Sequence, residues 1–548
     1  MTTAFEISDE LTDRWADSDP INATTYGIGG RDHLCTDYSP EGHHRRVGLY
    51  REMHDRLAAF CSANDRVEAF AARVMTGWLA EQIEEHESGK WRRDMNHVYS
   101  PFQVTRDVFD VMDRDTPEGW ADVEARLRGF GEAMDGYRLS LSEGLGAGDT
   151  AAARQVRSVL EQLDAAASDD SRFIGFIEQA ERAGIDVESL SDAIDQSRVA
   201  CARFAEWVRD SYLPRARPSD AVGRDEYLRE ADHHLGLMID PEETYDWAWG
   251  EIRRLTEEMA VTSASIDSDR SVDEVIDMLD TDPHRAASTR EEFVDFISEI
   301  QQQAIGQLAG AHFDVPDELR TVTVNIAPPG GSLGAWYVPP AEDFSRPGSI
   351  WYAPGERESL PYWQEVSTAY HEGFPGHHLQ VGTVVLERAN LSRFQRSVIW
   401  YSGAGEGWAL YAERLMDELG FFEKPEYRLG LLASQLFRST RVVVDIGCHL
   451  ELTIPDHAPL HEGEVWTYET AVDYIEQVAY QPHDVAVSEV LRYLGWPGQA
   501  ITYKVGEREI LGMRDRARAR VDFELKDFHR RMLAAGPIRL DLLGEEMA

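Results

Sequence analysis

Histidines and glutamates that could hold and use a metal ion cluster in the segment AYHEGFPGHH, residues 369–378. A further glutamate, Glu406, follows in the segment GEGWALY. Two imidazoles and one carboxylate are common protein ligands of catalytic zinc, with a fourth position open to water. Glu372 adjoins the candidate ligand His371, where it could take a proton from that water.

The spacing of the histidines differs from the usual His-Glu-x-x-His motif, which places both histidines on one helix face. Position i+4 from His371 is Pro375, and the next histidines are His377 and His378. On an ideal helix, residue i+6 lies about 9 Å along the axis and points to another side. Because proline interrupts helices and the flanking glycines permit unusual backbone angles, we expect a break at 373–376. The break would bring one of the two histidines back to the metal; the alternative is a turn that contains histidines by chance.

Four segments of the chain carry a family resemblance. In order, they are AYHEGFPGHHLQ, GAGEGWALYAERL, RVVVDIGCH and RYLGWPGQAITYKVGEREI, and they resemble the DUF885 family of bacterial proteins, related to zinc peptidases of the gluzincin type. The resemblance is strong from about residue 336 to residue 544. It implies a mostly helical fold, one zinc ion per protomer and hydrolysis of peptide or amide bonds. The family pattern maps His371, Glu372 and His377 onto the histidine motif and Glu406 onto the downstream glutamate ligand.

The composition of the chain limits its class and its partners. Its 548 residues are 43% hydrophobic, enough for a substantial core, and carry a formal net charge of −45. Such a charge repels nucleic acid and anionic membranes, so we expect neither as a partner. The N-terminus lacks a basic region followed by an apolar run, and no stretch is long and apolar enough to span a membrane. We therefore expect a cytoplasmic protein, with its four widely spaced cysteines as free thiols.

Helical periodicity dominates the chain on both sides of one break. Apolar residues recur at helical intervals through most of residues 49–212, and Pro214–Ser219 then interrupts the pattern. We place a domain boundary there, with an N-terminal helical region at 1–213 and a catalytic region at 214–548. Helices resume from residue 225 and again after Tyr362.

A small sheet is expected before the histidine motif. Residues 321–326 alternate and are β-branched, and residues 334–338 and 349–352 are aromatic segments bounded by proline and glycine. We expect three short antiparallel strands within about 321–353. In gluzincins an edge strand lines the cleft and pairs with extended substrates; the alternative is a purely structural hairpin. The expected architecture is a mainly α, large two-lobed helical body with this sheet ahead of the metal-binding helix.

Other polar side chains are candidates for supporting roles. Glu413 lies seven residues after Glu406 on the same helix face, and the pattern favours an exposed carboxylate over a partner of the metal site. Arg441, Asp445 and His449 share one face of an apolar helix. Asp445 could accept a ring N–H from a ligand histidine, and His449 could stabilise an oxyanion; the alternative is a buried ion pair.

The segment RYLGWPGQAITYKVG supplies two further candidates. Zinc peptidases use a tyrosine or histidine to stabilise the tetrahedral oxyanion, and an arginine to hold a substrate carboxylate. We expect Tyr503 to take the first role and Arg492 the second, although buried tyrosines and salt-bridged arginines are common in any fold.

The sequence therefore predicts a zinc-dependent hydrolase of peptide bonds in short peptides. Zinc would be held by His371, His377 and Glu406, and Glu372 would be the general base. One alternative is a zinc amidohydrolase that acts on a non-peptide amide or ester. The other is a catalytically silent binding protein, against which Glu372 argues because a structural metal needs no base.

Overall fold

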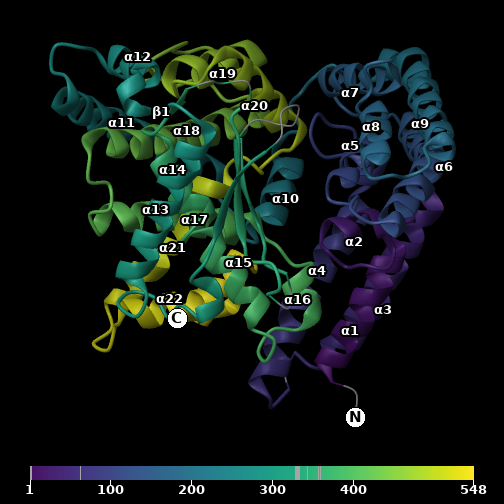
Figure 1. The fold of residues 1–548 in the computed structure, drawn as a ribbon, viewed down its shortest axis with the longest axis horizontal. Helices are drawn as coiled ribbons and strands as arrows, with labels where there is room; N and C mark the ends of the chain where they lie inside the picture. Colours follow the sequence, from purple (N-terminus) through teal and green to yellow (C-terminus); the bar gives the residue numbers. More distant parts are fainter. Residues whose placement is uncertain (1–2, 62, 328–333, 342–343, 356, 358) are drawn as a thin grey trace. The chain divides into compact units, whose positions relative to one another are not determined.

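The computed structural model describes every residue except 1–2, 62, 328–333, 342–343, 356 and 358. The fold is mainly helical with a few short strands, as predicted. The chain divides into two compact units (Figure 1). Unit 1 contains Met1–Ala221, Ser392–Ile399 and Leu491–Trp496, and unit 2 contains Val222–Leu391, Trp400–Val490 and Pro497–Ala548. Among the described residues, no helix is both long enough and apolar enough to cross a membrane.

Unit 1 is helical. Its helices are α1 (Ala4–Ser18), α2 (Pro20–Thr25), α3 (Pro40–Ala58), α4 (Arg66–Ser88), α5 (Pro101–Asp107), α6 (Pro117–Ala147), α7 (Ala153–Ala167), α8 (Gly175–Arg182), α9 (Glu188–Trp207) and α16 (Arg393–Ser397). The hydroxyl of Thr116 caps α6 by accepting a hydrogen bond from the Gly119 N–H, with Pro117 at the first helical position. α6 and α7 pack on α9, and their apolar faces bury a core that includes Phe109, Phe130 and Phe173.

Unit 2 holds most of the remaining α-helices and the strands of the described residues. Its helices are α10 (Arg224–Leu235), α11 (Pro241–Ile266), α12 (Val272–Thr281), α13 (Arg290–Leu308), α14 (Glu365–Glu372), α15 (His377–Leu386), α17 (Ser402–Glu418), α18 (Pro425–Leu450), α19 (Tyr468–Asp473), α21 (Thr502–Arg518), α22 (Leu525–Ala535) and α23 (Leu540–Met547). α20 (His483–Gly495) has residues in both units. α11 packs on α18 and α17 packs on α21, while α14 contacts α13, α17 and α18.

The small sheet is mixed, which corrects the expectation of an antiparallel sheet. β2 (Thr323–Ile326), β3 (Gly334–Val338) and β4 (Ser349–Ala353) form a sheet in the order β2-β4-β3, in which β2 runs parallel and β3 antiparallel to β4. β3 occupies one edge of β4, so β2 pairs at the other edge, and the intervening chain is long enough for a parallel pair. A separate pair, β1 (Ala286–Ala287) with β5 (Leu360–Pro361), is antiparallel.

The sheet supports the helix that carries the histidine motif. Val324, Ile350 and Tyr352 pack in one apolar cluster with Phe293 and Ile297 of α13 and with Ala369 of α14. β4 is the central strand, and four of its five residues are buried. The face of α14 that carries Ala369 is thus fixed against α13 and the sheet.

The predicted break in the histidine helix is confirmed. α14 ends at Glu372, and α15 begins at His377. A Cβ atom at Gly376 would lie 2.0 Å from the carbonyl oxygen of His371, so no larger side chain fits at this turn. The rings of His371 and His377 lie 4.9 Å apart across the break.

A buried glutamine of α13 replaces a hydrogen bond that the break removes. Oε1 of Gln301 accepts a 2.7 Å hydrogen bond from the Phe374 N–H, and its Nε2 donates one of 2.7 Å to the Ala369 carbonyl. Gln301 is buried, so water does not compete for these groups. The neighbouring Gln302 is exposed.

α17 and α21 approach so closely that only glycine fits between them. A Cβ atom at Gly407 of α17 would lie 2.5 Å from the backbone of Gly506, and one at Gly506 would lie 2.1 Å from the Gly403 carbonyl oxygen. Gly407, next to Glu406, therefore leaves the space that α21 occupies.

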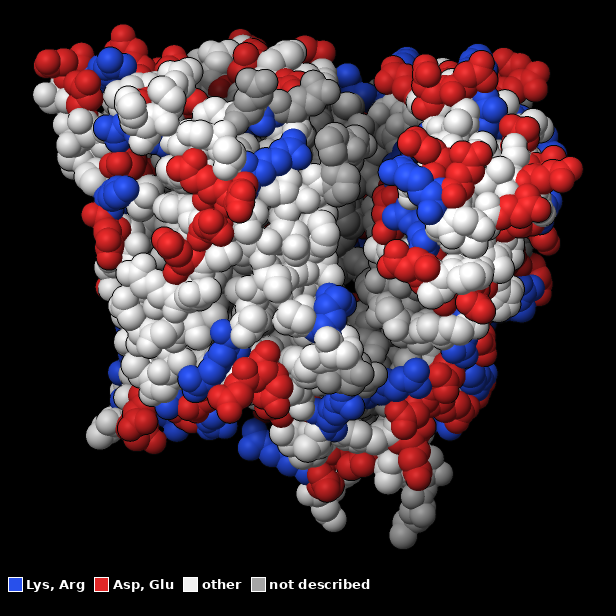
Figure 2. Space-filling model, viewed as in Figure 1, with Lys and Arg blue, Asp and Glu red and all other residues white. Residues whose placement is uncertain are grey.

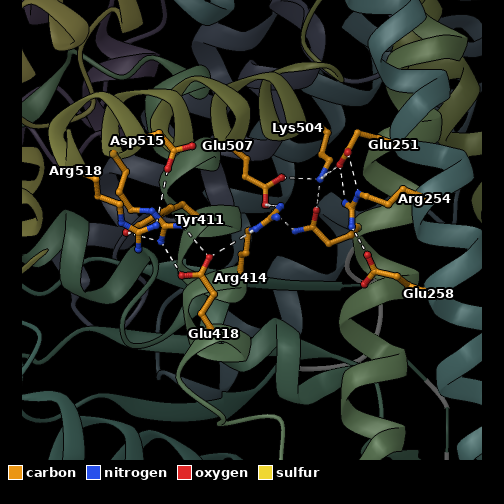
Figure 3. A network of polar contacts seen from close by, with 12 residues as sticks. Glu251, Arg254, Glu258, Tyr411, Arg414, Glu418, Lys504, Glu507, Asp515 and Arg518 are labelled. Atoms are coloured by element: carbon orange, nitrogen blue, oxygen red, sulfur yellow. Dashed lines mark hydrogen bonds and ion pairs between the residues drawn. The ribbon is translucent and has the colours of Figure 1, made fainter.

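Buried charges tie the same helices to α11 and α18. Nζ of Lys504 contacts Glu507 at 2.6 Å, Gln435 and, at 3.2 Å, Glu251 (Figure 3). Lys504 is 1% exposed. Burial raises the pKa of Glu251, but Arg254 and Lys504 lower it to about 2. On the face in Figure 2, carboxylates lie mostly toward the edges of each unit, with broad uncharged areas between them.

Replacing Gln301 by leucine should loosen the break. The Phe374 N–H would be left buried without a partner, which costs about 1–3 kcal/mol. Hydrogen–deuterium exchange of a peptide spanning residues 370–380 should accelerate in Gln301→Leu and stay unchanged in the control Gln302→Leu. Equal exchange in both variants would mean that Gln301 does not hold the turn.

Replacing Lys504 by methionine should destabilise the protein strongly. Glu507 would stay buried without its main counter-charge, and removing one member of a buried pair costs about 3–5 kcal/mol. Lys526→Met is the control, since its pair with Asp314 is partly exposed and worth at most about 1 kcal/mol. Urea unfolding measures both; a similar small loss in both variants would contradict a structural role of the buried network.

Candidate metal centre

The break between α14 and α15 brings the three predicted ligands together. Nε2 of His371 lies 3.2 Å from Oε2 of Glu406, and Nε2 of His377 lies 3.5 Å from the same oxygen. One ligand atom from each side chain lies within 4.8 Å of the other two, and we call these three side chains, His371, His377 and Glu406, the metal group. In the part of the chain that the structure describes, no second group of histidine, cysteine, aspartate and glutamate side chains converges in this way.

The separations between these atoms suit a zinc ion. Tetrahedral zinc with bonds of about 2.0–2.2 Å holds its ligand atoms about 3.3–3.6 Å apart. The two measured separations lie at or near this range. Two histidines and one glutamate are also the donor set of catalytic zinc sites that keep one position open.

Glu413 fixes the orientation and tautomer of His371. Its Oε1 accepts a 2.7 Å hydrogen bond from Nδ1 of His371, and its Oε2 accepts one from Ser367. Because a carboxylate accepts, the bond places a proton on Nδ1 and leaves the Nε2 lone pair facing Glu406. Nε2 of His371 and Oε2 of Glu406 are then two acceptors that face each other, and they need a cation or a second proton between them.

The same contact corrects the interpretation of Glu413 as an exposed helix carboxylate. Its exposure is 0%. The i+7 spacing from Glu406 was a correct indication of a shared helix face, and the neighbouring helix α14 buries that face. A charge so deeply buried needs partners, and His371 and Ser367 provide them.

Electrostatics in the site favour a positive charge between the imidazoles and the carboxylate. Burial lowers the pKa of His371, but hydrogen bonds with Glu406 and Glu413 outweigh it and raise the pKa to about 9. Burial raises the pKa of Glu406, yet bonds from His371 and His377 hold it below its ordinary value. A metal ion offers these atoms the same compensation as a proton.

Glu372 lies beside this group without a hydrogen bond to its carboxylate from any described residue. Burial raises its pKa, and the charges of His371 and His377 partly offset that effect. Its side chain is half-buried. An ionisable group in this position, with a raised pKa and free acceptor atoms, suits a general base.

The structure distinguishes between His377 and His378. His378 is buried, and its Nδ1 lies 3.0 Å from the Tyr337 hydroxyl while its Nε2 lies 3.0 Å from the Leu319 carbonyl. Both ring nitrogens are therefore engaged away from His371. His377 is the histidine that faces Glu406.

Tyr503 lies next to the group, as the sequence analysis expected. Its ring stacks on that of His371 with centroids 6.4 Å apart. Two arginines of α18 lie over the same ring, Arg441 at 4.9 Å and Arg438 at 5.9 Å. Tyr503 is half-buried, so a reacting group can reach its neighbourhood.

Asp445 does not hydrogen-bond His371 or His377, which corrects its assignment, whereas the oxyanion role of His449 stays a prediction. Asp445 accepts hydrogen bonds from the Tyr227 hydroxyl at 2.8 Å and the Gly498 N–H at 3.0 Å, and Glu413 takes the predicted role beside His371. His449 is fully buried, 3.7 Å from Asp445. The helical spacing placed these residues on one face correctly, but that face packs against α10.

Arg492 belongs to unit 1, whereas the metal group belongs to unit 2. Its guanidinium lies over the ring of Tyr493 at 5.0 Å. Its assignment as a carboxylate anchor stays a prediction.

The sequence analysis missed Arg438, which reaches the site from α18. Its Nη2 lies 3.6 Å from Oε1 of Glu413, and its charge lowers the pKa of Glu372. A signal existed, because Arg438 precedes Arg441 by three residues, and residues at that spacing are neighbours on a helix surface.

Comparisons with known proteins agree on the family and the fold. The family model described as "Bacterial protein of unknown function (DUF885)" matches residues 20–547. Two solved structures share the fold, and both proteins are described as a "putative lipoprotein". The one from Colwellia psychrerythraea is 22% identical with a TM-score of 0.86, over 99% of this chain and 98% of its own. The one from Shewanella oneidensis is 17% identical with a TM-score of 0.74, over 100% and 99%.

Among curated proteins, none matches the sequence. The two structural similarities concern the fold alone, because their sequence identity is low. The family match, in contrast, extends over nearly the whole chain. The chain therefore belongs to DUF885, a family of bacterial proteins of unknown function.

Proposed function

We propose that this protein is a zinc-dependent hydrolase of peptide bonds in short peptides. The observation that carries the proposal is the convergence of His371, His377 and Glu406 beside Glu372. These three side chains would hold one zinc ion per protomer. Hydrolysis as the reaction class rests on the pairing of an open metal site with an adjacent carboxylate base.

Bound zinc would supply Lewis-acid chemistry, polarising a carbonyl oxygen and lowering the pKa of water. Glu372 accepts the proton of the attacking water and delivers it to the leaving amine nitrogen. Glu413 holds the proton on Nδ1 of His371, which keeps Nε2 available as a ligand. The Tyr503 hydroxyl donates a hydrogen bond to the oxyanion that develops on the carbonyl oxygen.

The preference for short peptides comes from the likeness of the motifs to gluzincin peptidases. A cytoplasmic location is part of the same proposal, whereas the two structural neighbours are described as putative lipoproteins. Acidic composition still argues against nucleic acid and anionic membrane as partners.

Elemental analysis should find about one zinc ion per protomer in protein purified without chelators. His377→Ala should lose the metal because one of three protein ligands is gone. His378→Gln is the matched control and should keep it, since His378 is held by Tyr337 and Leu319. Zinc retained in His377→Ala, or lost in both folded variants, would refute the ligand assignment.

Glu372→Gln should keep zinc and lose turnover of fluorogenic short peptides by about 10²–10⁴-fold, because an amide cannot accept the proton. Zinc content and turnover are measured on the same preparations. A parallel panel of non-peptide amides and esters tests the alternative substrates. A zinc-loaded protein that hydrolyses none of these compounds would instead be a silent binding protein.

A further inference from the structure

We infer that Arg438 receives a carboxylate group of the substrate. This inference rests on the proposed function for the identity of the reaction, but it concerns a binding group that can be tested without turnover. It assigns to unit 2 the anchoring role that the sequence analysis gave to Arg492.

Arg438 lies close to three side chains of the proposed reaction, Tyr503, Glu413 and Glu372. It lies over the ring of Tyr503 at 5.9 Å, and its Nη2 lies 3.6 Å from Glu413, the partner of His371. Its charge also acts on Glu372. A carboxylate that met Arg438 would therefore belong to a molecule whose other atoms lie near the metal group.

The hydrogen-bond donors of Arg438 are unused by the part of the chain that the structure describes. Its Nε is buried without a hydrogen-bond partner, and no described residue accepts a hydrogen bond from the guanidinium. The side chain is 15% exposed, so an outside molecule can reach it. A guanidinium offers five N–H donors in a planar fork that matches a carboxylate, and leaving them unpaired in a largely buried position is costly.

Glu413 is not a hydrogen-bond partner of the Arg438 guanidinium. At 3.6 Å, its oxygen is too far from Nη2 for a hydrogen bond. Both oxygens of Glu413 already accept hydrogen bonds, from His371 and from Ser367. Arg438 therefore contributes charge to Glu413 but not the directional contacts that would position it.

Two other arginines of α18 have guanidinium groups that are paired within the protein and serve as a comparison for Arg438. Arg441 forms a 2.9 Å ion pair with Glu489, and Arg428 donates to Thr262 at 2.9 Å and to Glu258 at 3.1 Å. Each of these two has a carboxylate within hydrogen-bond distance. Arg438 has the same side chain on the same helix without such a contact.

The charge of the surroundings makes a dedicated carboxylate receptor necessary for an acidic substrate. Glu406 and Glu413 contact the two ring nitrogens of His371, and Glu372 lies within range of the same charges, in a chain of net charge −45. They would repel a substrate carboxylate unless a cation met it directly. Two sources share this chemistry: the C-terminal carboxylate of a peptide and the side chain of an aspartate or glutamate within it.

The test measures peptide binding to the zinc-loaded Glu372→Gln protein by isothermal titration calorimetry. The probes are trialanine, trialanine amide, and the same amide with aspartate at its centre. Loss of a charged hydrogen-bonding pair changes affinity by about tenfold or more, so trialanine should bind at least that much more tightly than its amide. Tighter binding of the aspartate amide instead would identify a side-chain carboxylate as the source.

Variants in the same background assign the effect to a residue. Arg438→Gln should abolish the preference for carboxylates, Arg438→Lys should restore part of it, and Arg428→Gln should leave it intact. If Arg438 only positioned the metal group, Arg438→Gln would weaken binding of acid and amide equally. That result, or a preference that survives in Arg438→Gln, overturns the inference.

This experiment also separates the inference from the proposed function. Zinc content confirms that each variant is loaded, and circular dichroism confirms that it is folded. A wild-type protein that hydrolyses no peptide, yet binds carboxylates through Arg438, would refute the proposed reaction and keep the binding site. Equal binding of acid and amide in an enzyme that hydrolyses peptides would do the reverse.

Discussion

The candidate site depends on one constraint: two imidazoles six residues apart in sequence must face one carboxylate oxygen. A continuous helix cannot satisfy it, because residues at that spacing point in different directions. The chain meets the constraint with a turn in which Gly376 lies against the backbone at His371. Breaking a helix frees backbone groups, and Gln301 reaches in from α13 to satisfy one of them. The contact between α13 and α14 therefore supports the geometry of the candidate site as well as the packing of the core.

The second half of the site depends on how closely two helices approach. Glu406 and Glu413 lie on α17, and Tyr503 lies at the start of α21. Glycines at 403, 407 and 506 let the two backbones touch, and this contact brings Tyr503 within stacking distance of His371. Lys504, adjacent to Tyr503, binds Glu507 and Glu251 in the interior. Buried pairs of this kind add little net stability, but breaking one is costly, so they disfavour other registers of α21.

The sequence predicted those features of the fold that depend on residues close together in the chain. The helices, the three strands and the break at 373–376 follow from periodicity and turn residues, whereas the choice of His377 over His378 came from the family resemblance. The pairing of β2 with β4 did not follow from these patterns, because the partner of a strand depends on which edge of the sheet is open. Gln301 reaches the site from α13, which is distant in sequence, and no spacing rule applies to it. The spacing of Arg438 from Arg441 indicates a shared helix surface but not that this surface meets the site. The sequence analysis expected Asp445 to bind a ligand histidine, but Glu413 binds His371 instead. Periodicity predicts which face of a helix a residue occupies, whereas only tertiary packing determines what that face contacts.

The balance of charge explains why the contact proposed for Arg438 must be directional. Three carboxylates surround the candidate centre, and a divalent cation together with Arg438 would match their charge. A substrate carboxylate would then enter surroundings close to neutral, within a chain that repels anions at long range. General attraction cannot select such a group. The two parallel hydrogen bonds of a guanidinium can, since they depend on the planar shape of the carboxylate as well as on its charge. Arginine suits this position better than lysine, whose ammonium offers charge without the fork.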